Sequence, residues 1–156
     1  MEKKLLFLFI LLIGGFAFSQ TIFDTEKRDS TNIYYHSLKK MSELAGSSIA
    51  DNGIIYVEKN LFTDRLPDTV LDLKIEYLNQ AELIEKMKKK GEKIFLIRIV
   101  PLRIEKGTFF INVIPFNAYY YKKNLELVNS GGLKAEYKFD EEVNGLVFEK
   151  ANFGGI

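Results

Sequence analysis

The sequence of 156 residues contains no cysteine. This absence excludes a disulfide framework, thiolate metal sites and the class of exported proteins that carry a lipid on a cysteine. A chain without disulfides depends on its hydrophobic core, and this chain is long enough for one such core. We therefore expect a single domain over residues 33–156, with no cofactor and no metal site.

Histidine is almost absent, since His36 is the only one in the chain. With no cysteine and no Gly-x-Ser-x-Gly motif, one histidine argues against a nucleophilic triad. In a helix, His36 would lie about 200° around the axis from Leu38, on the side away from the apolar stripe. We therefore expect a solvated surface histidine, with a general base as the alternative.

Neither sign of charge is in excess, with 22 Lys and Arg against 21 Asp and Glu. A chain with this balance has no global basic surface for nucleic acid, which is not an expected partner. Asp64, Asp68 and Asp72 are spaced by four residues, as the ligands of a cation on one helix face would be. Pro67 interrupts that helix and no glycine-centred calcium loop is present, so we expect solvated loop carboxylates.

The first residues have the pattern of a secretory signal peptide. Lys3 and Lys4 precede an apolar run from Leu5 to Ile13, and small residues lead up to Ser19. This run is shorter than the roughly 20 residues that span a membrane. We expect residues 1–19 to be removed, residues 20–32 to form a flexible lead-in, and the mature chain to be periplasmic or extracellular without a stable transmembrane anchor. An uncleaved anchor is the alternative.

Hydrophobic residues are most concentrated between Lys93 and Tyr121. Two apolar, β-branched and aromatic segments are joined there at residues 105–107, and such segments favour strands. A short link that ends in glycine is typical of a hairpin, and we expect Ile104 to lie opposite Thr108.

Along the first strand of this hairpin, the apolar residues shift from odd-numbered to even-numbered positions, which would place them on opposite faces of a regular strand. Phe95, Ile97 and Ile99 share one face, but Leu102 and Ile104 have the opposite parity. One extra residue near Val100 and Pro101, a β-bulge, would return all five to one face and turn Arg98, Arg103 and Glu105 to the other.

The second strand of the hairpin is apolar on both faces. The two sets of side chains are Phe109, Ile111 and Val113 on one face and Phe110, Ile114 and Phe116 on the other. We expect helices to cover one face, and another layer or a partner to cover the other.

The remaining pattern predicts helices over residues 32–45 and 80–90. Asn79 and Glu82 resemble a capping box, and Gly91 follows the second helix. Strands are predicted at residues 54–57, 74–78, 125–128, 134–139 and 146–150. This order predicts an α+β domain in which a curved antiparallel sheet, ending in a four-strand C-terminal meander, packs one face against one or two N-terminal helices.

The order of elements resembles the nuclear-transport-factor-2-like superfamily of cone-shaped folds, with a cystatin-like fold as the alternative. The chain also resembles a family of small uncharacterised exported bacterial proteins, through the segments IRIVPLR and G-FF-N-IPF, the Ser130-Gly132 turn and the final Gly155-Ile156. Gly154 stands where many such proteins have an aromatic residue. The family resemblance implies secretion and no catalytic activity, and fold likeness alone does not assign a function.

Candidate ligand-binding residues lie on and beside the hairpin. Arg98 and Asn112, if they share a concave face, could orient a polar or anionic ligand in apolar surroundings. The complete candidate set is Arg98, Arg103, Asn112, Asn117 and Tyr119. The alternative is an outward arginine with a solvated head and an asparagine that serves the bulge.

Two further segments are candidate binding surfaces, one rich in lysine and the other containing tyrosines followed by lysines. Residues 86–90 with Lys93 form a lysine-rich segment that suits an anionic surface, or serves helix-end electrostatics and solubility. Tyr119, Tyr120 and Tyr121 precede Lys122 and Lys123, which is typical of sugar-binding or nucleic-acid-binding faces and also of a strand leaving the core.

From these patterns we expect an exported, non-enzymatic domain that binds a ligand or is a structural, envelope-associated protein. Its partner would be a protein, a surface component, or a small apolar or anionic ligand. The alternative is a small cone-fold hydrolase or isomerase that uses His36 and Arg98, which requires both side chains to reach one pocket.

Overall fold

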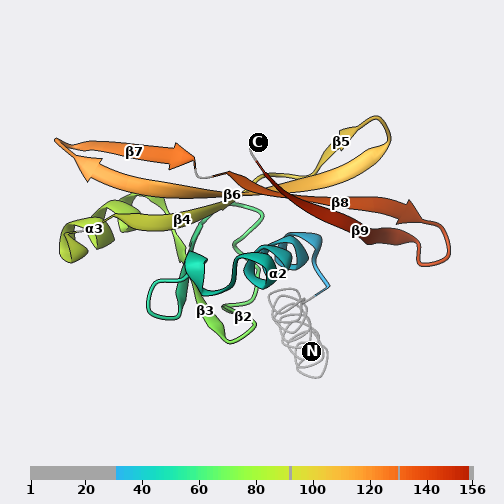
Figure 1. Ribbon diagram of the computed structural model, residues 1–156, viewed down its shortest axis with the longest axis horizontal. Helices are drawn as coiled ribbons and strands as arrows, with labels where there is room; N and C mark the ends of the chain where they lie inside the picture. The colour runs from blue at the N-terminus through green and yellow to red at the C-terminus, as the bar shows by residue number, and fades with distance from the viewer. Residues whose placement is uncertain (1–30, 92, 130, 155–156) are drawn as a thin grey trace, which may run out of the picture.

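The computed structural model describes residues 31–154 except residues 92 and 130. The predicted signal peptide, most of the predicted lead-in and the final Gly155-Ile156 lie outside these residues. Within them the chain forms one curved, mixed sheet of nine strands together with two α-helices, an α+β fold (Figure 1).

All the described helices precede β4 (Ile94–Ile99), and from β4 onward the described chain forms only strands and their connections. The order of the elements is α2 (Ile33–Ala45), the short 3₁₀ helix η1 (Gly46–Ile49), β1 (Ile54–Glu58), β2 (Thr69–Val70), β3 (Leu73–Leu78), α3 (Gln80–Lys90), β4, β5 (Arg103–Glu105), β6 (Thr108–Tyr121), β7 (Asn124–Asn129), β8 (Gly132–Asp140) and β9 (Gly145–Gly154).

Both helices begin and end where their capping residues predict. The Asn32 side chain accepts a hydrogen bond from the Tyr34 amide and caps α2. Asn79 and Glu82 form a reciprocal capping box at the start of α3, and the amide of Gly91, in the left-handed region, donates to the Met87 carbonyl at its end. These contacts satisfy backbone groups that a helix end leaves unpaired.

The long strand β6 organises the sheet. Along one edge it pairs with β4 and then β5, and along the other with β7 and β8. The complete strand order is β2-β3-β1-β4-β6-β8-β9. Figure 1 shows β6, β8 and β9 crossing the top of the molecule with α2 beneath their middle and α3 beneath one end.

The prediction of an antiparallel sheet with a four-strand meander is wrong in its details. Strand β1 lies between β3 and β4 and runs parallel to both. Helix α3 makes this arrangement possible because it carries the chain from β3 across to β4 in the same direction, as parallel strands require. The C-terminal half is antiparallel, but β5 and β7 both pair with β6 and lie off the main path.

The predicted hairpin and its bulge are confirmed, but the turn has two residues where the predicted pairing of Ile104 with Thr108 leaves three. Glu105 lies opposite Thr108 across a two-residue turn in which Lys106 and Gly107 both have positive φ. This turn matches the twist of the strands, and Gly107 adopts its backbone geometry at little cost.

The bulge is visible in the strand register. Arg103 pairs with Phe110, whereas Ile99 pairs with Val113. Three residues, 100–102, therefore face two on β6, and this extra residue is the one that the parity change predicted. The Val100 amide still donates to the Asn112 carbonyl across the bulge at 2.8 Å.

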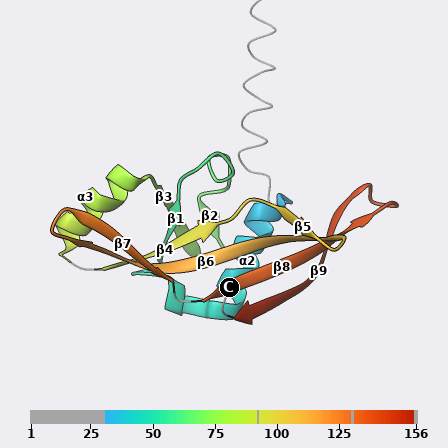
Figure 2. The same ribbon diagram turned by 90° about the horizontal axis from the view of Figure 1, so that it is seen from above.

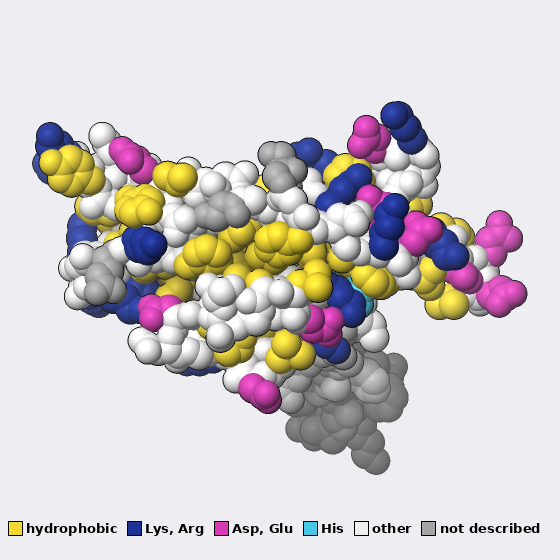
Figure 3. All heavy atoms as spheres, viewed as in Figure 1, with side chains coloured by type: hydrophobic (Ala, Val, Ile, Leu, Met, Phe, Trp, Pro, Cys, Tyr) yellow, Lys and Arg dark blue, Asp and Glu magenta, His cyan; other side chains and the backbone are white. Residues whose placement is uncertain are grey.

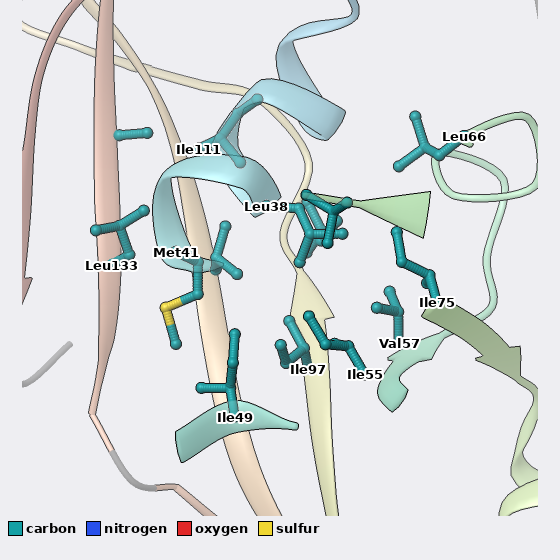
Figure 4. Close-up of a cluster of buried hydrophobic side chains, with 14 of the residues drawn as sticks. Leu38, Met41, Ile49, Ile55, Val57, Leu66, Ile75, Ile97, Ile111 and Leu133 are labelled. Carbon is teal, nitrogen blue, oxygen red and sulfur yellow. The ribbon is translucent and has the colours of Figure 1, made fainter. Parts of the chain in front are cut away.

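The larger core lies between α2 and one face of the sheet. Leu38 and Met41 of α2 point toward the sheet, where they meet Ile97, Ile111 and Leu133 (Figure 4). All five side chains are at most 1% exposed. This packing uses the odd-numbered residues of β6, as the alternation of a strand requires.

A second, smaller core lies between α3 and the opposite face. Leu83 and Met87 of α3 pack with Tyr56, Leu96 and Ala118. Neighbours of Tyr56 and Leu96 along their strands point into the first core, so the two helices cover opposite faces of the sheet. The prediction that helices cover only one face is therefore wrong. Strand β6 twists along its length, so both helices appear below it in Figure 1.

Candidate functional site

The structure brings three of the five candidate ligand-binding residues to one face of the sheet. Arg98 lies opposite Ile114 and Arg103 opposite Phe110, so both side chains share the face of Asn112 and the even-numbered residues of β6. Asn117 and Tyr119 have odd numbers on β6 and project from the other face. We call the surface formed by Phe110, Asn112, Ile114 and Phe116, with Arg98 and Arg103, the even face of β6.

Arg98 has a partner on this face. Its guanidinium donates two hydrogen bonds to the Glu58 carboxylate, of 2.5 and 2.9 Å, and its carbon centre lies 5.0 Å from the centroid of the Phe116 ring. The hydrogen bond that Arg98 donates to Glu58 is the main cause that raises the pKa of Arg98 above its usual value. A bidentate pair of this kind fixes the arginine and neutralises its charge.

Asn112 is buried beside this pair, with 8% of its surface exposed. Its side-chain Oδ1 atom has no hydrogen-bond partner among the described residues. The side chain therefore does not serve the bulge, whose amide bonds instead to the Asn112 backbone carbonyl.

The even face of β6 is only partly covered. Helix α3 packs at its far end, around Ala118 and Tyr120, while Ile114 and Phe116 remain half-buried. Lys134 of β8 lies over Phe110, with Nζ 4.3 Å from the ring centroid. Figure 3 shows apolar side chains exposed in a band across the middle of the molecule, with charged side chains gathered toward both ends.

His36 is not the solvated histidine that the sequence predicts. Its Nδ1 atom lies 3.1 Å from the Tyr137 hydroxyl, and its ring meets the Phe148 ring edge-on at 5.0 Å between centroids. Arg98 projects from the opposite face of the sheet. One pocket therefore cannot hold both side chains, and the geometry does not favour the hydrolase or isomerase alternative.

The surroundings of His36 make the stability of the protein depend on pH. Burial is the main cause that lowers the pKa of His36 below the ordinary value of 6.5, and Lys40 lowers it further. The unfolded chain takes up a proton as the pH falls below about 6.5, whereas the folded protein resists that proton. We expect the free energy of unfolding to decrease as the pH falls from about 6.5 through the lowered pKa of the folded state.

Nuclear magnetic resonance measures this effect without ambiguity because His36 is the only histidine. The imidazole should titrate below 6.5 in the folded protein. His36→Gln, measured in parallel by thermal unfolding, should lose this component of the pH dependence. A folded-state pKa at or above the ordinary value would contradict the expectation.

The lysine-rich segment and the tyrosine cluster meet in one groove. A hollow of about 390 Å³ lies between the end of α3 and the end of β6. Its walls are Met87, Lys88, Gly91, Lys93, Tyr119, Tyr120 and Tyr121, which we call the tyrosine–lysine groove. The left end of Figure 1 shows how α3 and the β6–β7 hairpin approach each other there.

The lysines of the segment differ in their partners. Lys86 forms an ion pair with Glu76, and Lys90 with Asp51. Lys88 and Lys93 form no ion pair with any residue that the structure describes. Instead, the Lys88 Nζ atom lies 5.3 Å from the centroid of the Tyr120 ring, a contact that holds an ammonium group without neutralising it.

Tyrosines lie on both faces of the sheet at this end of β6: Tyr120 faces Lys88, whereas Tyr119 and Tyr121 project from the other face. Tyr119 and Tyr121 are 38% and 65% exposed, and Lys122 lies 5.0 Å from the centroid of the Tyr121 ring. Tyrosine offers an apolar ring face and a polar tip to a ligand. Sequence reasoning identified the tyrosines and the lysines separately but did not place them in one site.

The other candidate sites do not assemble. Asp64, Asp68 and Asp72 lie in turns around β2 and not on a helix, and Asp64 lies 3.7 Å from the Lys59 ammonium group. Within residues 31–154, apart from the two positions left out, no three His, Cys, Asp or Glu side chains are placed to hold a metal ion. None of the described helices has the length and apolar character needed to cross a bilayer.

Comparison of the chain with protein-family models, with curated proteins and with solved structures found no match. The geometry of the site is therefore the basis for assigning a function.

Proposed function

We propose that this protein is an exported, non-enzymatic binding domain whose ligand is an acidic saccharide held in the tyrosine–lysine groove. The observation that carries the proposal is the meeting of three tyrosines with Lys88 and Lys93 around one hollow. Its volume of about 390 Å³ lies within the range of small-ligand sites. The export signal in the sequence and the resemblance to exported bacterial proteins support an extracytoplasmic saccharide as the ligand.

Each part of the groove matches a part of such a ligand. The ring of Tyr120, which lies on the same side of the sheet as Lys88, can pack against the apolar face of a sugar ring, and its hydroxyl can bond to the sugar hydroxyls. Lys88 and Lys93 can donate to a carboxylate without first breaking an ion pair to a described residue. Because the chain as a whole has no basic excess, this local charge favours a short acidic ligand over a long polyanion.

Calorimetric titration with tetragalacturonate tests the proposal. The double variant Lys88→Gln/Lys93→Gln should bind about tenfold more weakly or worse, because each charged hydrogen bond contributes on the order of 1.5–3 kcal/mol. Lys89→Gln is the matched control, since Lys89 is on the same helix but lines a different hollow beside Glu82 and Glu85. It should bind as the unaltered protein does.

Two further measurements separate charge from aromatic contact. Maltotetraose, which has no carboxylate, should bind much more weakly than tetragalacturonate, and Tyr120→Ala should weaken the binding of both sugars. Equal affinity for the two sugars, or an unchanged affinity in the double lysine variant, would show that the groove is not an acidic saccharide site.

A further inference from the structure

The last strand of the sheet, β9, has a free edge. It pairs with β8 on one side, and no described residue pairs with its other side. β9 runs for ten residues, Gly145–Gly154, and exposes Phe148 and Phe153 by 37% and 52%. An edge of this length presents a row of unpaired backbone donors and acceptors that can pair with another strand.

Two copies of β9 that run in opposite directions would place residues of opposite charge, and apolar residues, opposite each other. Its midpoint lies between Glu149 and Lys150. If two copies of β9 pair antiparallel over their whole length, Glu149 of each copy lies opposite Lys150 of the other, and opposite charges in facing positions are favourable. The same register places Leu146 opposite Phe153 of the second copy, and Phe148 opposite its Ala151.

A bulge in β9 keeps these facing residues on one side of the sheet. Phe148 pairs with Tyr137 and Lys150 with Glu136, so Glu149 is an extra residue in the ladder. Residues before it with even numbers and residues after it with odd numbers therefore share a face. The packing agrees, since Leu146 and Ala151 both pack against the core beneath α2.

From this complementarity we propose that a second copy of the chain pairs antiparallel along β9, related by a two-fold axis between Glu149 and Lys150. A two-fold axis produces a closed dimer. Each contact between one residue of the first copy and another residue of the second copy then occurs twice. A shift of two residues in either direction would separate Glu149 from Lys150 of the second copy. The edge of β7 lacks this property, because self-pairing about its midpoint would place Glu126 opposite Leu127.

Sedimentation velocity on the purified protein, from low to high micromolar concentration, tests this dimer. The unaltered protein should dimerise. Glu149→Lys and Lys150→Glu should each weaken dimerisation by about tenfold or more, because each places like charges opposite each other twice. Glu126→Lys on β7 makes the same charge change on another exposed edge strand and should leave dimerisation unchanged.

Mixing the two β9 variants gives the decisive result. Glu149→Lys and Lys150→Glu repel themselves but complement each other, so an equal mixture should form a heterodimer. Circular dichroism of each variant alone checks that it remains folded, since Lys150 also lies 3.3 Å from Glu136 within the same chain. A monomeric unaltered protein, or folded variants whose mixture stays monomeric, would overturn the proposal.

Discussion

Tyr137→Ala is expected to lower the free energy of unfolding by about 3–5 kcal/mol, the cost of removing a large buried aromatic side chain. Tyr137 is 1% exposed and lies on β8, facing α2, with its ring edge-on to His36 and Phe148 at 5.9 Å in each case. Its hydroxyl lies 2.7 Å from the Ser37 hydroxyl and donates to the Ile33 carbonyl at 3.1 Å. The variant would lose both the packing and this attachment of α2 to the sheet.

Chemical denaturation of three variants separates the contributions of the ring and the hydroxyl. Burial raises the pKa of Tyr137 to about 12, so the hydroxyl stays protonated near neutral pH. Tyr137→Phe keeps the ring and should cost about 1–3 kcal/mol, because it leaves buried polar groups without a partner. Tyr121→Ala removes a tyrosine that is 65% exposed and should cost much less. Similar losses at positions 137 and 121 would show that Tyr137 does not anchor α2.

Ile111→Ala is expected to destabilise the protein by about 2–5 kcal/mol. Ile111 is 0% exposed and lies in the first half of β6, where it packs with Leu38 and Leu133 in the larger core. Truncation would leave a cavity between α2 and the sheet, because a close-packed core relaxes only partly around a missing side chain.

Ile104→Ala provides the matched control for this substitution. Ile104 is in the same hairpin but is 65% exposed, so its loss should change the free energy of unfolding by no more than about 0.5 kcal/mol. Both values come from urea denaturation under one set of conditions. A small effect at Ile111, or an equally large one at Ile104, would contradict the description of β6 as the strand that carries the core.

Much of the local structure could be predicted because its causes lie within a few residues. Asn32, Asn79 and Gly91 mark helix ends by hydrogen bonds to neighbouring backbone groups. The parity change between Ile99 and Leu102 similarly revealed the bulge before any partner strand was known. The turn was predicted one residue too long because the alternative with Ile104 opposite Thr108 satisfies the same hydrophobic pattern.

The candidate site was predicted less completely than the fold. Arg98, Arg103 and Asn112 do share one face, which follows from alternation once the bulge is included. The role of Glu58 as the partner of Arg98 could not be foreseen, because forty residues separate the two in the sequence. His36 was misjudged because its angle from Leu38 describes only its own helix and not the strands β8 and β9 that pack beside it.

The sequence by itself determined the helices, the long hairpin and its bulge, because capping, turn geometry and side-chain alternation act between near neighbours. Only the tertiary structure decided that β1 lies between β3 and β4, that the helices cover opposite faces, and that Lys88 meets Tyr120 in one groove. These features depend on pairing between segments far apart in the chain, and a local pattern is compatible with several such pairings. The folded chain adopts the one that buries both faces of its central strands where helices are present to cover them.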